Sequence, residues 1–291
     1  MKTKRGGHFL EWMFPAILVG VSPFLCVPAN AAHEPIYAVD QYNNLIKFYS
    51  DAPGTIITAH AISGIQLGEE IRGIDYYRGT MYGLGSFSRL YSIDLNTAAA
   101  TPVGAAFSPL LNGTTFGFDN GPAGLQVVSA LAQNLLIDRT TGLVTVGPTL
   151  SYVAGDPHFG ATPRVDALTY DEASGKWYAG DTLQNSLALF NPTTGGLTTI
   201  GLNGIDTSKF NGLDFSWASG IMYLGSAAAS SDPQANLYTV DPTTGAVSLV
   251  GQIDYPGADT LIRALTVIPE PSSVALLALG AFGLLFARRP R

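Results

Sequence analysis

The chain has 291 residues, 46% hydrophobic and only 13% charged, so it can fill one large core and is not an intrinsically disordered protein. Its 33 glycines and 18 prolines, with few strong helix formers outside the two ends, predict an all-β fold of short strands and tight turns. Segment 32–268 holds nine basic and twenty acidic residues, hence a net charge of −11, which excludes nucleic acid and anionic membranes as expected partners and leaves room for cation binding.

The first 31 residues have the layout of a secretory signal peptide. Basic residues among the first five precede an apolar stretch at 12–27, and the small Ala29 and Ala31 occupy positions that signal peptidase requires to be small. We expect cleavage after Ala31, with Ala32 as the alternative. A packed N-terminal helix is the other interpretation, but three prolines would break it. The only cysteine, Cys26, lies in this segment, so the mature protein is expected to have no disulfide.

Four segments of the following region repeat one template of four strands. Their third strands contain leucines spaced 45, 52 and 50 residues apart, namely Leu90, Leu135, Leu187 and Leu237. Four strands in about 45 to 50 residues is the size of a propeller blade. Because one blade cannot bury both of its faces alone, the repeats are expected to pack in a ring.

The two ends of this region complete a fifth unit. Residues 36–39 and 45–48 match the second and third strands of the template, and 56–58 matches the fourth, but no first strand precedes them. Residues 263–267 fit that missing slot. The sequence therefore predicts a five-bladed β-propeller at 32–268, closed by its N- and C-terminal strands, which removes exposed sheet edges. The loops at 107–115 and 151–164 are long enough to hide an extra strand.

Similar turns recur between third and fourth strands, at 138–142, 191–195 and 241–245. Each begins with Asp or Asn, whose side chain can bond back to the backbone, and ends with Gly, which tolerates a left-handed conformation. We interpret them as hairpin turns. A calcium loop is the alternative, but carboxylates do not alternate along these segments.

Aligned blades place five residues at the position before each first-strand Gly or Ala. These residues are Arg72, Phe116, Asp166, Asn211 and Arg263. In a propeller such positions lie near the mouth of the central channel, where arginines can clamp a carboxylate or an acidic sugar. Arg72, Asp166, Asn211 and Arg263 are thus the candidate ligand-binding residues. The alternative is that they satisfy strand ends and one another across blades.

A second equivalent position recurs three residues further along. It holds Asp75, Asp119, Thr169, Asp214 and Thr266. A catalytic residue has no reason to recur in most blades, so this position predicts a structural hydrogen bond.

Motifs for catalysis are absent from the sequence. No Gly-x-Ser-x-Gly or phosphate loop occurs, and the three histidines of the mature chain form no metal-spacing pair. Asp156, His158 and Asp166 would make a metal site only if their loop folded them together. We expect no cofactor and no resident metal, and we assign no catalytic residue.

The C-terminal residues 269–291 form a tail. A Pro-Glu-Pro motif precedes sixteen uncharged residues and a basic end; its marker residues are Pro269, Glu270, Pro271, Arg288 and Arg289. This length and flanking charge predict a transmembrane helix, a buried core helix being the alternative. The tail resembles the PEP-CTERM sorting signal. The resemblance implies recognition by an exosortase-type enzyme after a transient membrane-anchored intermediate, and delivery to the cell surface or an extracellular matrix.

The repeat region resembles an uncharacterised, propeller-like domain-of-unknown-function family of secreted bacterial proteins. Its most specific stretches are 73–76, 81–85 and 89–94. That family has no established reaction, so the resemblance implies no catalytic residue.

Two functions are compatible with this sequence. The first is a non-catalytic surface or matrix protein that recognises exopolysaccharide, with signal peptidase and exosortase as processing partners. The second is a propeller enzyme, a metal-dependent lactonase or a polysaccharide lyase, acting at the channel. A divalent metal held by channel carboxylates and amides would distinguish them, and its absence would favour the binding protein.

Overall fold

The computed structural model describes residues 33–207, 211–227, 234–254 and 260–268. The predicted signal helix and the predicted C-terminal helix lie outside the described residues. The described part contains only strands, turns and loops.

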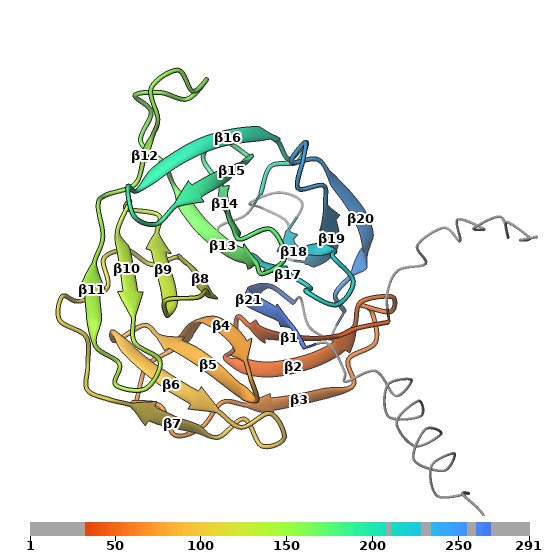
Figure 1. The fold of residues 1–291 in the computed structure, drawn as a ribbon. Coiled ribbons are helices and arrows are strands. Elements are labelled where there is room, and N and C mark those ends of the chain that lie inside the picture. The colour runs from red at the N-terminus through yellow and green to blue at the C-terminus, as the bar shows by residue number, and fades with distance from the viewer. Residues whose placement is uncertain (1–32, 208–210, 228–233, 255–259, 269–291) are drawn as a thin grey trace, which may run out of the picture. The chain divides into compact units, whose positions relative to one another are not determined.

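Five sheets, numbered here as blades 1 to 5, surround a central channel (Figure 1). Blade 1, from the channel outward, consists of β21 (Ile262–Val267), β1 (Pro35–Asp40), β2 (Asn44–Tyr49) and β3 (Thr58–Ala61). Blade 2 consists of β4 (Ile71–Tyr77), β5 (Thr80–Gly85), β6 (Arg89–Ile93) and β7 (Ala100–Val103). Blade 3 consists of β8 (Phe116–Asn120), β9 (Leu125–Ser129), β10 (Asn134–Ile137) and β11 (Val144–Val146). Blade 4 consists of β13 (Val165–Asp171), β14 (Lys176–Asp181), β15 (Ser186–Asn191), β16 (Gly196–Leu202) and the short β12 (Ser151–Tyr152). Blade 5 consists of β17 (Asn211–Phe215), β18 (Met222–Ala227), β19 (Ala235–Val240) and β20 (Val247–Gln252).

The innermost strands form a closed ring. β21 packs beside β4, β4 beside β8, β8 beside β13, β13 beside β17, and β17 beside β21. Closure depends on blade 1, where the C-terminal β21 pairs antiparallel with the N-terminal β1, Ala38 lying opposite Leu265. The predicted five-bladed propeller, closed by strands from both ends of the chain, is confirmed.

The hydrophobic core consists of five clusters, and each joins two neighbouring blades. Val39 of blade 1, for example, packs with Ile74 and Met81 of blade 2, and Leu84 of blade 2 packs with Phe118 of blade 3. The remaining clusters join blades 3 and 4, 4 and 5, and 5 and 1. Because each blade is apolar on both faces, no blade can bury its surface without two neighbours.

The recurring turns are hairpin turns, as predicted. Asp138 Oδ1 accepts the backbone N–H groups of Thr140 (2.9 Å) and Thr141 (2.8 Å), and Gly142 has φ +69°. The turn connects β10 to β11.

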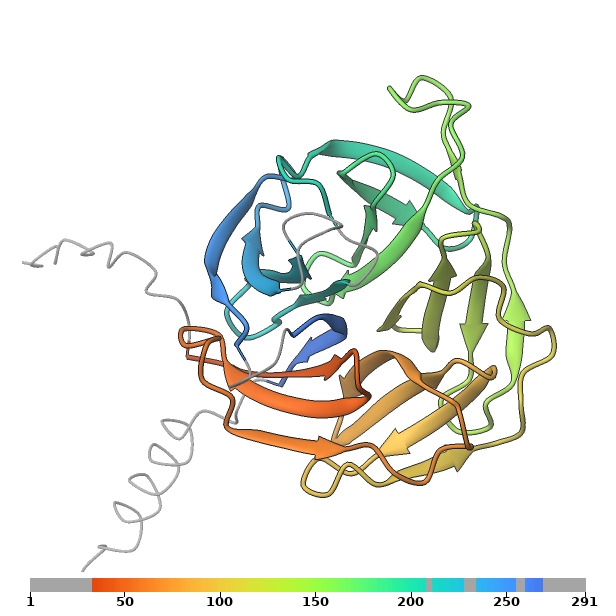
Figure 2. The same cartoon turned by 180° about the vertical axis from the view of Figure 1, so that it is seen from behind.

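The structure differs from the predicted strands in two loops. The fourth strand of blade 1 begins at Thr58 rather than at residue 56, because a turn in which Thr55 N donates to Ala52 O (3.0 Å) delays its pairing with β2. The loop at 151–164 hides an extra strand, β12, which pairs parallel with β16. The rest of that loop projects beyond the ring (Figure 2). Residues 107–115 are described and contain no strand.

Candidate functional site

Two predicted channel-mouth residues, Arg72 and Arg263, meet at one carboxylate. Both lie where the register of an innermost strand shifts, on β4 and β21. Arg263 Nη2 donates to Glu70 Oε1 (2.8 Å), and Arg72 forms an ion pair with the same carboxylate. Burial lowers the pKa of Arg263, while the negative charge of Glu70 opposes that shift. The anion that the two arginines hold in the structure is therefore a side chain of the same chain.

The other two mouth residues, Asp166 and Asn211, pair with each other between blades 4 and 5. Asn211 Nδ2 donates to Asp166 Oδ1 (3.2 Å), and Thr182 Oγ1 donates to Asp166 Oδ2 (3.1 Å). Burial raises the pKa of Asp166 to about 7, although both hydrogen bonds favour the carboxylate. This is a buried acid that titrates near neutrality.

The mouth residues thus form two separate groups among the described residues. Glu70 holds the arginines, and Asp166 holds Asn211. Phe116, at the fifth equivalent position, packs in the core between blades 2 and 3. The side chains of each group bind one another, as the alternative interpretation expects. A ligand site at the mouth stays a prediction.

Deeper in the channel, the second equivalent position brings three carboxylates together. Asp75 of β4, Asp119 of β8 and Asp214 of β17 each place one oxygen within 4.8 Å of the others. Each follows its mouth residue by three positions, so the cluster lies about 10 Å further along the strands at roughly 3.3 Å per residue. All three are buried, with exposed fractions of 5%, 5% and 8%.

The predicted hydrogen bonds between blades are present at this position. Asp119 Oδ2 accepts the backbone N–H of Tyr170 on β13 (2.6 Å), and Asp214 Oδ2 accepts that of Val267 on β21 (2.6 Å). The hydroxyl of Thr266 donates to Asp214 Oδ2 at 3.0 Å. Each bond ties a carboxylate of one innermost strand to the next blade.

Burial raises the pKa of each carboxylate in this axial cluster. For Asp119 the shift is large, because the charges of Asp75 and Asp214 add to the effect of burial. The cluster faces a cavity of about 40 Å³. Other side chains around this cavity include Tyr76, Tyr77, Tyr170, Glu172, Phe215 and Trp217.

Of the three loop residues considered as an alternative metal site, Asp156 and His158 meet at Thr199, whereas Asp166 lies apart from them. Asp156 accepts hydrogen bonds from its own loop and from Thr199 N (2.6 Å), and His158 Nδ1 lies 3.1 Å from Thr199 Oγ1. Asp166 instead binds Asn211. Within the described residues, the axial cluster is the one grouping of metal-ligating side chains.

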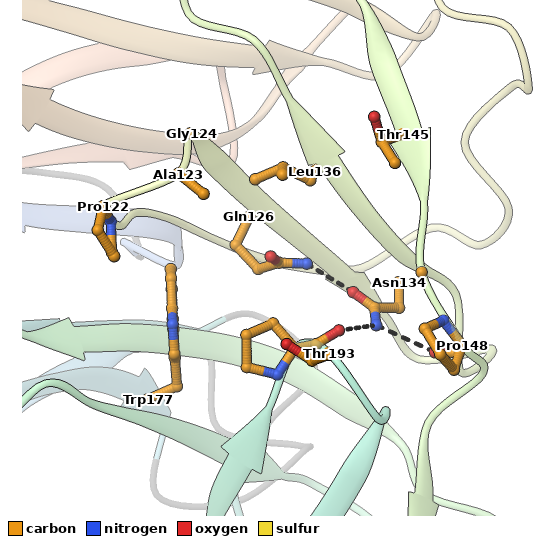
Figure 3. A pocket seen from close by; sticks show the side chains of 12 residues that line it. Pro122, Ala123, Gly124, Gln126, Asn134, Leu136, Thr145, Pro148, Trp177 and Thr193 are labelled. Carbon is orange, nitrogen blue, oxygen red and sulfur yellow. Dashed lines mark hydrogen bonds between the residues drawn. The ribbon is translucent and has the colours of Figure 1, made fainter.

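A pocket that the sequence analysis did not anticipate lies between blades 3 and 4 (Figure 3). Its volume is about 420 Å³, and the indole ring of Trp177 forms one wall, across from Asn134 and Pro148. The remaining lining residues are Pro122, Ala123, Gly124, Gln126, Leu136, Thr145, Gly147, Pro192 and Thr193.

One residue explains why the pocket opens at this interface. The second-strand residue opposite the recurring Asp or Thr is a tyrosine in four blades, namely Tyr37, Tyr82, Tyr178 and Tyr223. Each tyrosine packs against or within the core shared with the next blade. In blade 3 the equivalent residue, opposite Asp119, is Gln126. A smaller amide thus replaces a phenol ring at the interface of blades 3 and 4. This exception to the tyrosine pattern was the sequence signal for the pocket.

Hydrogen bonds fix the two amides of the pocket. Gln126 Nε2 donates to Asn134 Oδ1 (2.5 Å) and to Leu135 O (2.9 Å), while Asn134 Nδ2 donates to Pro148 O (3.0 Å) and Pro192 O (3.1 Å). These bonds use the amide nitrogens and leave the Gln126 carbonyl oxygen as an acceptor. All of the lining residues are uncharged.

In the part of the chain that the structure describes, we find no helix that is both long and apolar enough to span a bilayer.

Solved structures similar to this one include Myxococcus xanthus glutaminyl cyclase, with 11% identity and a TM-score of 0.49 over 72% of this chain and 83% of that chain. A protein of unknown function from Bacteroides caccae has 11% identity and a TM-score of 0.43 over 82% of this chain and 100% of that chain. A structural genomics protein of unknown function from Bacteroides thetaiotaomicron VPI-5482 has 15% identity and a TM-score of 0.51 over 81% of this chain and 65% of that chain. This last similarity supports the fold alone. No curated protein matches the sequence significantly.

Two family models match the chain. Residues 267–291 match the PEP-CTERM protein-sorting motif, which confirms the predicted sorting tail and indicates export, processing by an exosortase and sorting to the surface. Residues 44–266 match a second family model, and this match spans most of the chain, from β2 to β21. The protein therefore belongs to the family described as Domain of unknown function (DUF4394).

Proposed function

We propose that this protein is a non-catalytic, saccharide-binding module of the cell surface or extracellular matrix, and that the pocket between blades 3 and 4 holds one or two sugar units of an exopolysaccharide. The observation that carries the proposal is the pocket itself. Its volume of about 420 Å³ lies within the range of roughly 300 to 1,000 Å³ that is typical of ligand sites. In this proposal signal peptidase removes residues 1–31, and residues 269–291 anchor the chain in the membrane until exosortase processing.

The chemistry of the pocket suits a neutral sugar. An indole ring offers an apolar face on which the C–H groups of a sugar ring can stack, and the Gln126 carbonyl oxygen and the hydroxyls of Thr145 and Thr193 offer hydrogen bonds. An acidic sugar would meet no cation in the pocket. It would also approach a domain whose net charge is −11.

The same residues argue against catalysis in this pocket. Its lining has no Asp, Glu, His, Lys, Cys or Tyr side chain, so it supplies no general acid, general base or activated nucleophile. The alternative, a lactonase or lyase acting in the channel, would use the axial carboxylates. The cavity there is about 40 Å³, little more than the roughly 30 Å³ of one water molecule, which is too small for a sugar ring.

Gln126→Tyr is the sharpest test of the pocket. Four other blades carry tyrosine at this position, so the variant is expected to fold and to fill the space that a sugar would occupy. Neutral oligosaccharides from the exopolysaccharide of the producing cells would be titrated into the wild-type and variant proteins by calorimetry. We expect Gln126→Tyr to weaken binding at least tenfold while the melting temperature is retained.

A matched pair of turn variants controls for unspecific effects. Thr193→Trp places a ring at the rim of the pocket, whereas Thr243→Trp changes the same position of the equivalent turn in blade 5, outside the pocket. We expect only Thr193→Trp to weaken binding. Equal affinity of all variants, or no saccharide binding by the wild-type protein, would contradict the proposal.

A further inference from the structure

The three axial carboxylates are placed as the ligands of a single ion. One oxygen from each of Asp75, Asp119 and Asp214 lies within 4.8 Å of the others. Calcium–oxygen distances are about 2.3 to 2.6 Å, so two ligands on opposite sides of one ion lie up to about 5 Å apart. Three strands of three different blades thus present oxygens at the spacing of one coordination sphere.

Described side chains leave this negative charge unpaired. None of the salt bridges within the described residues involves Asp75, Asp119 or Asp214. Burying carboxylates beside one another without a cation is strongly unfavourable, so either bound protons or a bound cation must neutralise them.

One oxygen of the cluster also lacks a hydrogen-bond donor. Asp119 and Asp214 each use both carboxylate oxygens as acceptors. Asp75 Oδ2 is buried and accepts no hydrogen bond from the described residues. Asp75 Oδ1 lies 3.3 Å from the Thr266 hydroxyl, whose single hydrogen is shared with the nearer Asp214 Oδ2 (3.0 Å). Asp75 lines the cavity of about 40 Å³, which has room for an ion with one water molecule.

We propose that Asp75, Asp119 and Asp214 bind one calcium ion on the propeller axis. The nearby hydroxyls of Thr169 and Thr266 belong to the same ring of positions, and both donate to Asp214. This donor set consists of oxygen alone, which favours a hard cation over zinc. Calcium accepts irregular geometry and six to eight ligands, which suits oxygens fixed by separate sheets and completed by water from the cavity. Because the cavity of about 40 Å³ has no room for a sugar substrate, the ion would be structural and not catalytic. It would tie blades 2, 3 and 5 together at the centre of the ring.

The test uses the full-length protein, purified in a mild detergent, depleted of metal with a chelator and titrated with calcium chloride. We expect calcium to bind with a dissociation constant below about 1 mM and to raise the melting temperature by several degrees. In Asp75→Asn the binding should weaken at least tenfold and the shift should disappear. Asp40→Asn removes a buried carboxylate at the end of β1, away from the cluster, and should keep the wild-type response.

The metal-free proteins distinguish the ion from a folding defect. Because Asp75→Asn removes one of three mutually repelling charges, it should melt at or above the wild-type temperature in chelator and below it in calcium. A variant that melts lower in both conditions, with calcium still stabilising it, would overturn the proposal. So would a wild-type protein that calcium does not stabilise, since the charges of the cluster would then be neutralised in another way, such as by bound protons.

A measurement on the wild-type protein needs no variant. Terbium, which replaces calcium at oxygen sites, should show luminescence sensitised by the aromatic rings around the cavity, and calcium should displace it. Tyr76, Tyr170 and Trp217 are among these rings. Absence of luminescence that calcium can displace would also overturn the proposal.

Discussion

Equivalent residues of the five blades have diverged in chemistry while keeping their place around the channel. At the mouth, Arg72 and Arg263 bind Glu70, while Asp166 binds Asn211. One layer deeper, every blade contributes an oxygen. Equivalent residues occupy the same position in all five blades, so this position does not by itself decide their chemistry. The chemistry of each layer depends on the neighbours that a side chain meets in the adjacent blade.

Asp166 should make the stability of the protein depend on pH. Its pKa is raised by burial to about 7, whereas an unfolded Asp titrates near 3.9. The native state therefore keeps a proton that the unfolded state releases, so the stabilisation from Asp166 is complete below about pH 4 and is lost as pH rises through 7. Asp166→Asn should remove this dependence, so its gain in stability over wild type should grow from near zero at about pH 4 to a few kcal/mol at about pH 8, at about 1.4 kcal/mol per pKa unit.

Urea unfolding of both proteins at several pH values checks this expectation. Asp241→Asn is a control for which the expected change in stability has the opposite sign. Hydrogen bonds from Thr243 lower the pKa of Asp241, so the stabilisation from its carboxylate is present above about pH 4. That variant should be slightly less stable than wild type at neutral pH. Parallel pH profiles of the wild-type and Asp166→Asn proteins would show that Asp166 is ionised in the native state.

At the scale of elements, the recurring turns also hold neighbouring blades together. Gly142, Gly195 and Gly245 all have positive φ, as their turns require. A Cβ at Gly195 would overlap the carbonyl oxygen of Thr149, and Cβ atoms at the other two would overlap Val103 O and Gly201 O. The glycine of each turn therefore packs against the last strand of the preceding blade or against the segment that follows that strand.

Two glycine variants separate the conformational effect from the packing effect. Gly195 and Gly175 have φ values of +73° and +70°, and each donates its N–H to a carbonyl four residues earlier (2.8 Å). A Cβ at Gly175 would come no closer than 3.7 Å to another residue. Gly175→Ala should cost about 1 kcal/mol from backbone strain, and Gly195→Ala roughly 1 to 3 kcal/mol more from overlap. Urea midpoints measure both, and equal losses would rule out the packing role.

The whole ring depends on the pairing of its two ends. β21 supplies the innermost strand of blade 1, contacts β4 and β17, and carries the backbone N–H that Asp214 accepts. Without β21, the channel-side edge of β1 and two inter-blade faces would be exposed to solvent.

Two truncated chains test this closure. A chain that ends at Ile268 keeps β21 and should be monomeric with a cooperative thermal transition. A chain that ends at Thr260 lacks β21 and should aggregate or fail to fold, as measured by size-exclusion chromatography and circular dichroism. If the shorter chain melted cooperatively at the same temperature, closure by β21 would not be needed for stability.

By itself, the sequence determined the number of blades, the role of the two ends and the sorting tail. Those features depend on local patterns, namely the repeated third-strand leucines, the turn glycines and the tail motif. Each of these patterns can be recognised within one short segment of the sequence. Only the tertiary structure decided which equivalent residues meet. It separated Arg72 and Arg263 from Asp166, brought Asp75, Asp119 and Asp214 within 4.8 Å, and opened a pocket where Gln126 replaces a tyrosine. The physical reason is that each of these sites lies between blades. Its distances are set by how neighbouring sheets pack, and that information is spread over residues far apart in the chain.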